Sequence, residues 1–134
     1  SGAMRPARNY WVITTRPDHL PHATPVWGLW VDDVFYFCCG QKSQKARNIA
    51  ANPNVVVHLE SGDDVVILEG VLELIKDKGV YPSLSEEYLR KYDFDPFGEN
   101  GVQPGDPLYA LRVKKAYAWR EKDFPKSATR WKFE

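Results

Sequence analysis

The chain has 134 residues, of which 43% are hydrophobic and 27% are charged, a composition that supports one folded domain with one core. Its 18 Lys and Arg residues balance 18 Asp and Glu residues, and the absence of a basic excess argues against a nucleic-acid-binding protein. No apolar run reaches the ~18 residues of a membrane helix, so we expect neither a membrane nor a nucleic acid as its partner.

Three short strands are expected at the start of the chain. The β-branched and aromatic residues 10–16 predict the first. Residues 22–31 predict a second strand, which is interrupted at Pro25 and Gly28 because proline cannot donate a ladder hydrogen bond and glycine allows a close backbone approach. Residues 34–39 predict a third strand, so this part of the chain should form an antiparallel meander.

The second half of the chain predicts another hairpin, a helix and a last strand. Residues 54–61 and 64–75 read as two strands around a Gly-Asp turn. Residues 79–92 change to helical spacing of the apolar side chains. Residues 93–107 are rich in Gly and Pro and predict a long surface loop, after which residues 108–121 predict a long strand.

Together these elements predict a mainly β protein with six antiparallel strands and two short helices. A small barrel suits them because it removes open sheet edges. We expect a single domain over residues 4–134, since the opening Ser-Gly-Ala is typical of a cloning remnant.

Cys38 and Cys39 are adjacent and would point to opposite faces of a strand, so no mutual disulfide is expected. Two free thiols fit the reducing cytoplasm.

The stretch GQKSQKARNIAANPN at residues 40–54 carries an unusual charge pattern. It predicts a short helix with Ser43 as its N-cap, ended by the Asn-Pro pair. Lys42, Lys45 and Arg47 crowd the N-terminal end, where each cation costs about 0.3–1 kcal/mol against the helix dipole. A bound phosphate would offset that cost, although the pattern alone leaves open a solvated basic face.

These motifs resemble a known family. The ordered segments RPDHLPHATPVWG and KSQKARN, followed by NPNVVVH, are similar to those of the pyridoxamine 5'-phosphate oxidase-like superfamily of flavin- and deazaflavin-binding split barrels. The resemblance covers residues 10–70, and a weaker similarity returns in residues 116–133. It implies a six-stranded split β-barrel that binds a flavin or deazaflavin cofactor.

The resemblance also implies a cofactor site made from three parts of the chain. The start of the basic helix would bind the cofactor phosphate, the interrupted strand would run under the ring with its backbone, and the C-terminal segment would reach the second site of a homodimer whose two cofactor sites lie at the interface. The residues are Lys42, Ser43, Lys45, Arg47 and Asn48 for the phosphate, Pro25, Val26 and Trp27 for the ring, and Trp119, Arg130 and Trp131 from the C-terminal segment.

The second strand bears on which cofactor is bound. FMN-dependent members carry an Arg and a Lys there for the FMN phosphate, whereas this chain reads HATPVWGLW. The resemblance therefore favours coenzyme F420, a deazaflavin with a phosphodiester and an anionic tail, and a reductase that passes a hydride from reduced F420 to an unsaturated small-molecule substrate. The alternatives are an FMN-binding oxidoreductase and a non-enzymatic cofactor- or haem-binding protein. No catalytic residue is identified, and His58 is expected to be a packed strand residue.

Overall fold

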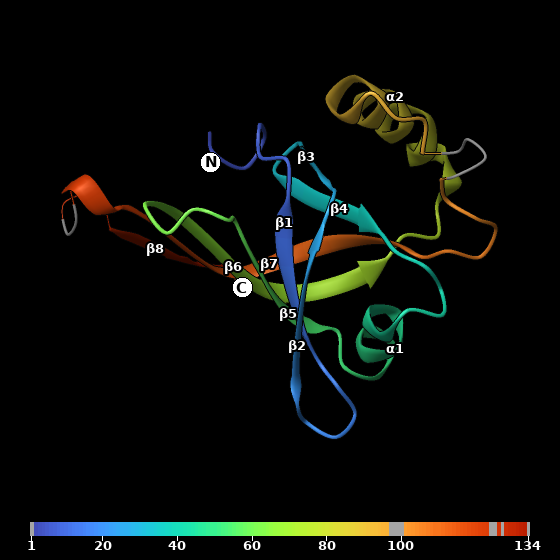
Figure 1. Ribbon diagram of the computed structural model, residues 1–134, viewed down its shortest axis with the longest axis horizontal. Helices are drawn as coiled ribbons and strands as arrows, with labels where there is room; N and C mark the ends of the chain where they lie inside the picture. The colour runs from blue at the N-terminus through green and yellow to red at the C-terminus, as the bar shows by residue number, and fades with distance from the viewer. Residues whose placement is uncertain (1, 97–100, 124–125, 127, 134) are drawn as a thin grey trace.

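A computed structural model of the chain describes residues 2–96, 101–123, 126 and 128–133 (Figure 1). The strands are β1 (Tyr10–Thr15), β2 (Pro21–Val26), β3 (Leu29–Val31), β4 (Val34–Cys38), β5 (Asn54–His58), β6 (Asp64–Leu74), β7 (Leu108–Arg120) and β8 (Thr129–Lys132). The α-helices are α1 (Gln44–Ala51) and α2 (Tyr81–Tyr92), and short 3-10 turns cover Lys78–Val80 and Glu121–Asp123.

The described strands form one antiparallel sheet that curls into a split barrel. Their order is β2-β1-β5-β6-β7-β4-β3, with β8 paired to β7. The two end strands, β2 and β3, are consecutive in the chain and are separated only by Trp27 and Gly28, so the two ends of the sheet meet there. The mainly β split-barrel fold expected from the sequence is confirmed.

The predicted second strand divides in two at Trp27 and Gly28. A Cβ on Gly28 would lie 2.5 Å from Cε1 of Phe35 and 2.9 Å from the carbonyl oxygen of Tyr36, closer than a real side chain allows. Glycine therefore lets the chain cross from one end of the sheet to the other. The predicted interruption of the strand at Gly28 is therefore a bend of the barrel wall between β2 and β3.

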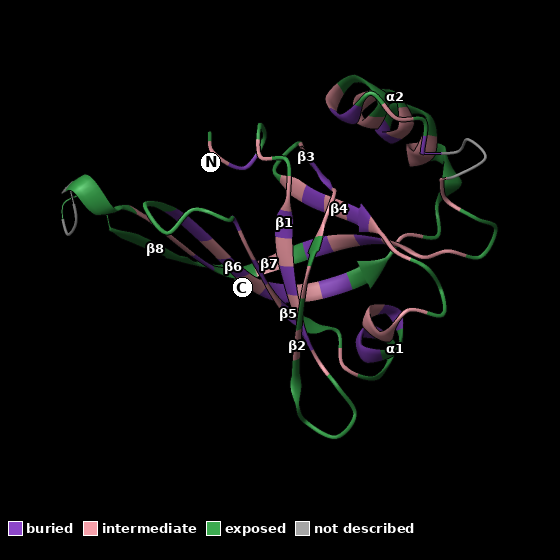
Figure 2. Cartoon of the chain, viewed as in Figure 1, coloured by how far each residue is buried: buried purple, intermediate pink, exposed green. Residues whose placement is uncertain are grey.

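An eighth strand follows β7 and was not expected. β8 pairs with β7 from Lys132 opposite Lys115 to Thr129 opposite Ala118, and all four of its residues are exposed. Figure 1 shows β8 with the adjoining ends of β6 and β7 on the side of the molecule away from both helices. Figure 2 shows the same strand coloured as exposed, so it contributes little to the core.

Both helices pack against the barrel, but in different ways. Asn48 of α1 is completely buried, and its Nδ2 donates to Oγ1 of Thr14 on β1 over 2.9 Å. From α2, Leu84 and Tyr92 are buried beside Leu29 of β3 and form a second, smaller apolar cluster. Among the described residues no helix is long and apolar enough to cross a membrane.

The main core lies inside the barrel and also receives the N-terminal segment. Its side chains come from alternate positions of β1, β4, β5, β6 and β7 (Figure 2). Met4 is 1% exposed, and Ala3 packs against the same cluster. The chain thus contributes to the core from before β1, including a residue that the sequence analysis set aside.

Candidate functional site

The start of α1 has the geometry that its sequence predicts. The Oγ of Ser43 accepts the backbone N–H of Ala46 over 3.1 Å, so Ser43 is the N-cap. No acidic residue occupies the first turn. The positive end of the helix dipole therefore has no carboxylate of its own helix beside it.

The three predicted cations do not have equivalent surroundings. The guanidinium of Arg47 donates to the carbonyl oxygen of Lys42 over 3.0 Å and to Oε1 of Gln44 over 2.6 Å, so this side chain braces the turn before α1. Lys42 is exposed, whereas Lys45 is half-buried. Lys45 is therefore the cation placed furthest toward the interior.

Lys45 lies beside two residues of the barrel wall. Burial lowers the pKa of His22 on β2, and the charges of Arg16 and Lys45 lower it further. Burial also raises the pKa of the Cys39 thiol, whereas a hydrogen bond with Ser43 and the charge of Lys45 lower it. The charge of Lys45 thus acts on His22 of β2 and on Cys39, the residue after β4.

Two polar atoms on β2 lie next to this point without a partner among the described residues. His22 is opposite Thr14 in the β1–β2 register, and Thr14 bonds to α1 through Asn48. Nδ1 of His22 and Oγ1 of Thr24 are both buried and make no hydrogen bond. Buried polar atoms normally have a partner, so they mark a place where a ligand would satisfy them.

The sequence analysis did not include His22 or Arg16 among the cofactor-binding residues. Each is a single polar residue near a turn, and only the pairing of β1 with β2 brings them to the side where α1 packs. The signal that could have pointed to them is the hairpin itself, which places the ends of both strands beside the helix that follows β4.

The segment predicted to run under the cofactor ring has one open backbone edge. β2 is the end strand of the sheet, so one row of its N–H and C=O groups faces no strand among the described residues. Pro25 is exposed and Val26 packs on the core. Trp27 leaves the strand and stacks on Tyr92 with ring centroids 4.6 Å apart, while the Arg8 guanidinium lies 4.8 Å from its ring centroid. The Trp27 side chain is therefore a packing residue against α2.

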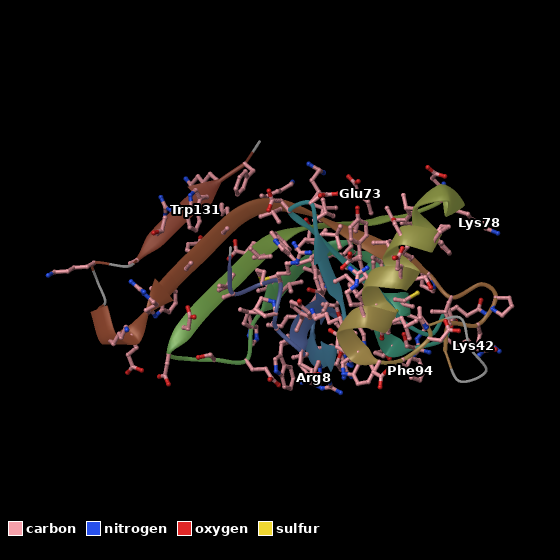
Figure 3. All side chains as sticks on the ribbon, turned by 90° about the horizontal axis from the view of Figure 1, so that it is seen from above. Arg8, Lys42, Glu73, Lys78, Phe94 and Trp131 are labelled. Carbon is pink, nitrogen blue, oxygen red and sulfur yellow. The ribbon has the colours of Figure 1, made fainter. Side chains whose placement is uncertain are left out.

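Other predicted site residues lie apart from this group. Asn48 has no exposed surface, so its amide can act on a cofactor only by holding α1 in place. Arg130 and Trp131 are exposed on β8 and face opposite sides of the strand ribbon. Figure 3 shows Trp131 and Lys42 at opposite ends of the molecule, so one chain alone does not bring them together.

A cavity of about 280 Å³ lies beneath α2. Its walls come from α2, β3, β4 and the described part of residues 93–107, and they include Trp27, Leu84 and Tyr88. Cys39 and Gly40 form the wall nearest α1. The cavity thus begins close to the N-cap of α1 and continues under the second helix.

The remaining His and Cys side chains have structural surroundings. The His58 ring stacks on Trp11 at 6.3 Å between centroids, and its Nδ1 lies 2.7 Å from the carbonyl oxygen of Leu59, so the expectation of a packed residue is confirmed. Both thiols are free, and the Cys38 Sγ donates to the carbonyl oxygen of Pro107 over 3.0 Å. Within the described ranges no group of three or more His, Cys, Asp or Glu side chains could hold a metal ion.

A comparison against known families agrees with this fold. The family model described as pyridoxamine 5'-phosphate oxidase matches residues 3–120. The chain belongs to the pyridoxamine 5'-phosphate oxidase family. The resemblance found in the sequence is therefore confirmed at the level of the family.

Solved structures related to this member of the pyridoxamine 5'-phosphate oxidase family differ in what their names say they do. An F420 reductase is 27% identical, with 84% of this chain and 90% of that chain covered and a TM-score of 0.64. The conserved hypothetical protein Rv2991 from Mycobacterium tuberculosis is 23% identical, with 87% and 79% covered and a TM-score of 0.73. A heme binding protein from Mycobacterium smegmatis is 14% identical, with 98% and 54% covered and a TM-score of 0.76. None of the curated proteins matches.

Proposed function

We propose that the chain binds coenzyme F420 and uses its reduced form to reduce an unsaturated small molecule. The observation that carries this proposal is the start of α1, which is capped by Ser43 and carries Lys42, Lys45 and Arg47 with no acidic residue in its first turn. The ion pairs found among the described residues involve Arg90 and Arg112 and none of these three. Cations at a helix N-terminus whose first turn holds no acidic residue are stabilised by a bound anion.

The residues present fit a phosphate-bearing deazaflavin. Ser43 and Lys45 would hold the phosphate, and the unpartnered atoms of His22 and Thr24 give it further polar contacts. The open backbone edge of β2 would lie along the ring. When bound, the reduced cofactor supplies a hydride from its central ring carbon, and the acceptor takes up one proton from solvent. The chain itself contributes binding, orientation and the exclusion of water.

FMN is the second candidate, and the same cluster favours it. An FMN phosphate is a monoester that carries up to two negative charges, which two cations and an imidazole would match well. Against FMN stands the run His-Ala-Thr-Pro-Val along β2, which offers neither a Lys nor an Arg side chain. The family name and the F420 reductase among the structural relatives are compatible with either cofactor.

A titration with both cofactors separates these candidates. Quenching of the fluorescence of the five Trp residues reports binding of F420 or FMN to the purified chain. We expect F420 to bind more tightly, and Lys45→Ala to weaken its binding by about 1–3 kcal/mol, the size of a lost charge-assisted hydrogen bond. Lys76→Ala, at an exposed lysine beyond the end of β6, is the matched control and should bind like the wild type.

Two outcomes would contradict the proposal. Tight FMN binding with weak F420 binding would make the chain an FMN oxidoreductase. An F420 affinity that is the same in Lys45→Ala and the wild type would mean that the cations at α1 do not hold the cofactor phosphate. Unfolding in urea, measured beside each titration, shows whether a variant is folded well enough to be compared.

We also propose that the chain acts as a homodimer through the outer face of its sheet. Trp11, His58, Ile67 and Tyr117 form one row across four neighbouring strands on the side away from the core. All four are half-buried in the single chain. A second copy seated on this row would cover its three aromatic rings and the Ile67 side chain. The free thiols suit the reducing cytoplasm, in which we propose that this dimer works.

A further inference from the structure

We propose that the cavity beneath α2 binds the molecule to be reduced, and that it accepts flat, uncharged ring compounds and excludes phosphorylated ones. The assignment of this ligand as the hydride acceptor rests on the proposed function. The chemical class of the ligand is inferred from the residues that line the cavity and does not depend on the proposed function. Pyridoxamine 5'-phosphate, the compound in the family name, is therefore excluded as a substrate of this chain.

The cavity walls favour a flat apolar ligand. The aromatic side chains of Trp27, Tyr36, Tyr88 and Phe94 line it, and Leu84 adds an aliphatic side chain from α2. Aromatic faces stack on planar rings and bury a large apolar area. The volume of about 280 Å³ lies at the small end of the ~300–1,000 Å³ range of ligand cavities, so it suits a small ring compound.

The charge of the walls excludes a phosphate. No described residue that lines the cavity is a Lys, Arg or His. The carboxylate that lines it, Asp106, accepts the backbone N–H of Gln41 over 3.0 Å and that of Gln103 over 2.9 Å. A phosphate dianion placed here would lose its hydration without gaining a cation, which is unfavourable. Lys42 and Lys45 lie outside the walls, at α1.

The polar groups of the walls can recognise a neutral oxygen. Burial raises the pKa of Tyr88 to about 12, so its hydroxyl stays protonated and uncharged at neutral pH. Ser85, three residues earlier on α2, also lines the cavity and has a second hydroxyl. A ring compound that carries a carbonyl or similar acceptor would satisfy these donors without any charge.

The cavity adjoins the cofactor site at two places. Cys39 lines the cavity and is hydrogen-bonded with Ser43, the N-cap residue at the proposed phosphate position. Trp27 lines it as well and follows directly on β2, the strand proposed to lie under the ring. A molecule in the cavity would therefore lie between α2 and the cofactor, where hydride transfer needs it.

The test uses the neutral naphthalene ketone 6-propionyl-2-(dimethylamino)naphthalene, whose fluorescence changes when it leaves water. It is titrated into the unmodified chain and into Leu84→Trp, in which an indole would occupy the cavity. We expect this variant to bind the dye about tenfold or more weakly, because the added ring takes the space of the ligand. Leu89→Trp on the same helix, at a side chain that is 49% exposed, should bind the dye like the wild type.

The cofactor titration is run in parallel, so that a failure of either proposal can be recognised. Dye binding that is lost in Leu84→Trp while neither F420 nor FMN binds would support the cavity and overturn the proposed function. Cofactor binding without dye binding would overturn the cavity alone. Displacement of the dye by pyridoxamine 5'-phosphate would overturn the exclusion of phosphates. If Leu84→Trp is unfolded by circular dichroism, Ser85→Phe narrows the same cavity, and unchanged dye binding there overturns the proposal.

Discussion

Lys91 shows how a single charged residue is held in this barrel with no carboxylate partner among the described residues. Its Nζ donates to the hydroxyl of Tyr10 over 2.6 Å and to the carbonyl oxygen of Gly28 over 3.1 Å. The same nitrogen lies 4.7 Å from the ring centroid of Tyr10 and 5.2 Å from that of Tyr92. These contacts are neutral acceptors and aromatic faces, so burial lowers the pKa of Lys91 to about 8.

This pKa predicts how stability depends on pH. The unfolded chain keeps the Lys91 proton up to the ordinary pKa of 10.5, whereas the folded chain releases it above about 8. Between these values the unfolded state binds more protons, so the Lys91 contribution to the free energy of unfolding rises with pH. The free energy of unfolding in urea should be measured for the wild type and for Lys91→Met. From pH 8 to pH 10 it should rise in the wild type relative to the variant. Parallel pH profiles would contradict the prediction, and Lys76→Met is the exposed control.

At the level of elements, the bend between β2 and β3 is held by the end of α2. The backbone N–H of Gly28 donates to the hydroxyl of Tyr92 over 3.0 Å, and the ring of Tyr92 stacks on Trp27. The missing side chain of Gly28 makes room for Phe35. The helix and the bend therefore stabilise each other, and one change at Gly28 should disturb both.

Gly28→Ala tests this coupling. The new Cβ would meet the Phe35 ring and a backbone carbonyl, so we expect a loss of about 1–3 kcal/mol in the free energy of unfolding, as for other overpacked sites. Gly62→Ala is the matched control, since nothing lies within 4 Å of its added Cβ. Equal urea midpoints for the two variants would show that the bend tolerates a side chain.

The same elements show how far the sequence could predict the fold and the site. Strand patterns and the Ser43 cap depend on neighbouring residues, so they could be read directly from the sequence. The division of the second strand depends on Tyr92, which is 64 positions from Gly28, and no local pattern reports such a contact. For the same reason the cations around Lys45 could be read from the sequence, whereas the effect of Lys45 on His22 and the burial of Asn48 required the packing of α1 on β1.

For the whole molecule, the outer face of the sheet predicts the oligomeric state. Ile67→Lys places a charge in the middle of the row that contains Trp11, His58 and Tyr117. Because a charge buried in an apolar interface without a partner is unfavourable, the variant should sediment as a monomer at concentrations where the wild type is a dimer. Leu89→Lys, at an exposed leucine of α2, should leave the mass unchanged. A monomeric wild type would contradict the prediction.

The meeting of the two sheet ends at Trp27 and Gly28 also determines when the barrel can close during synthesis. β2, β3 and β4 leave the ribosome early, and β3 can pair with β4 at once, but the other edge of β4 is paired only by β7, where Cys38 lies opposite Leu108. Closing the loop between β4 and β7 lowers the chain entropy before the new contacts can stabilise the barrel. Folding should therefore be slow for a chain of this length. Until β7 has been made, β4 and β6 each lack a neighbouring strand, and the nascent chain presents unpaired edges to other proteins in the cell.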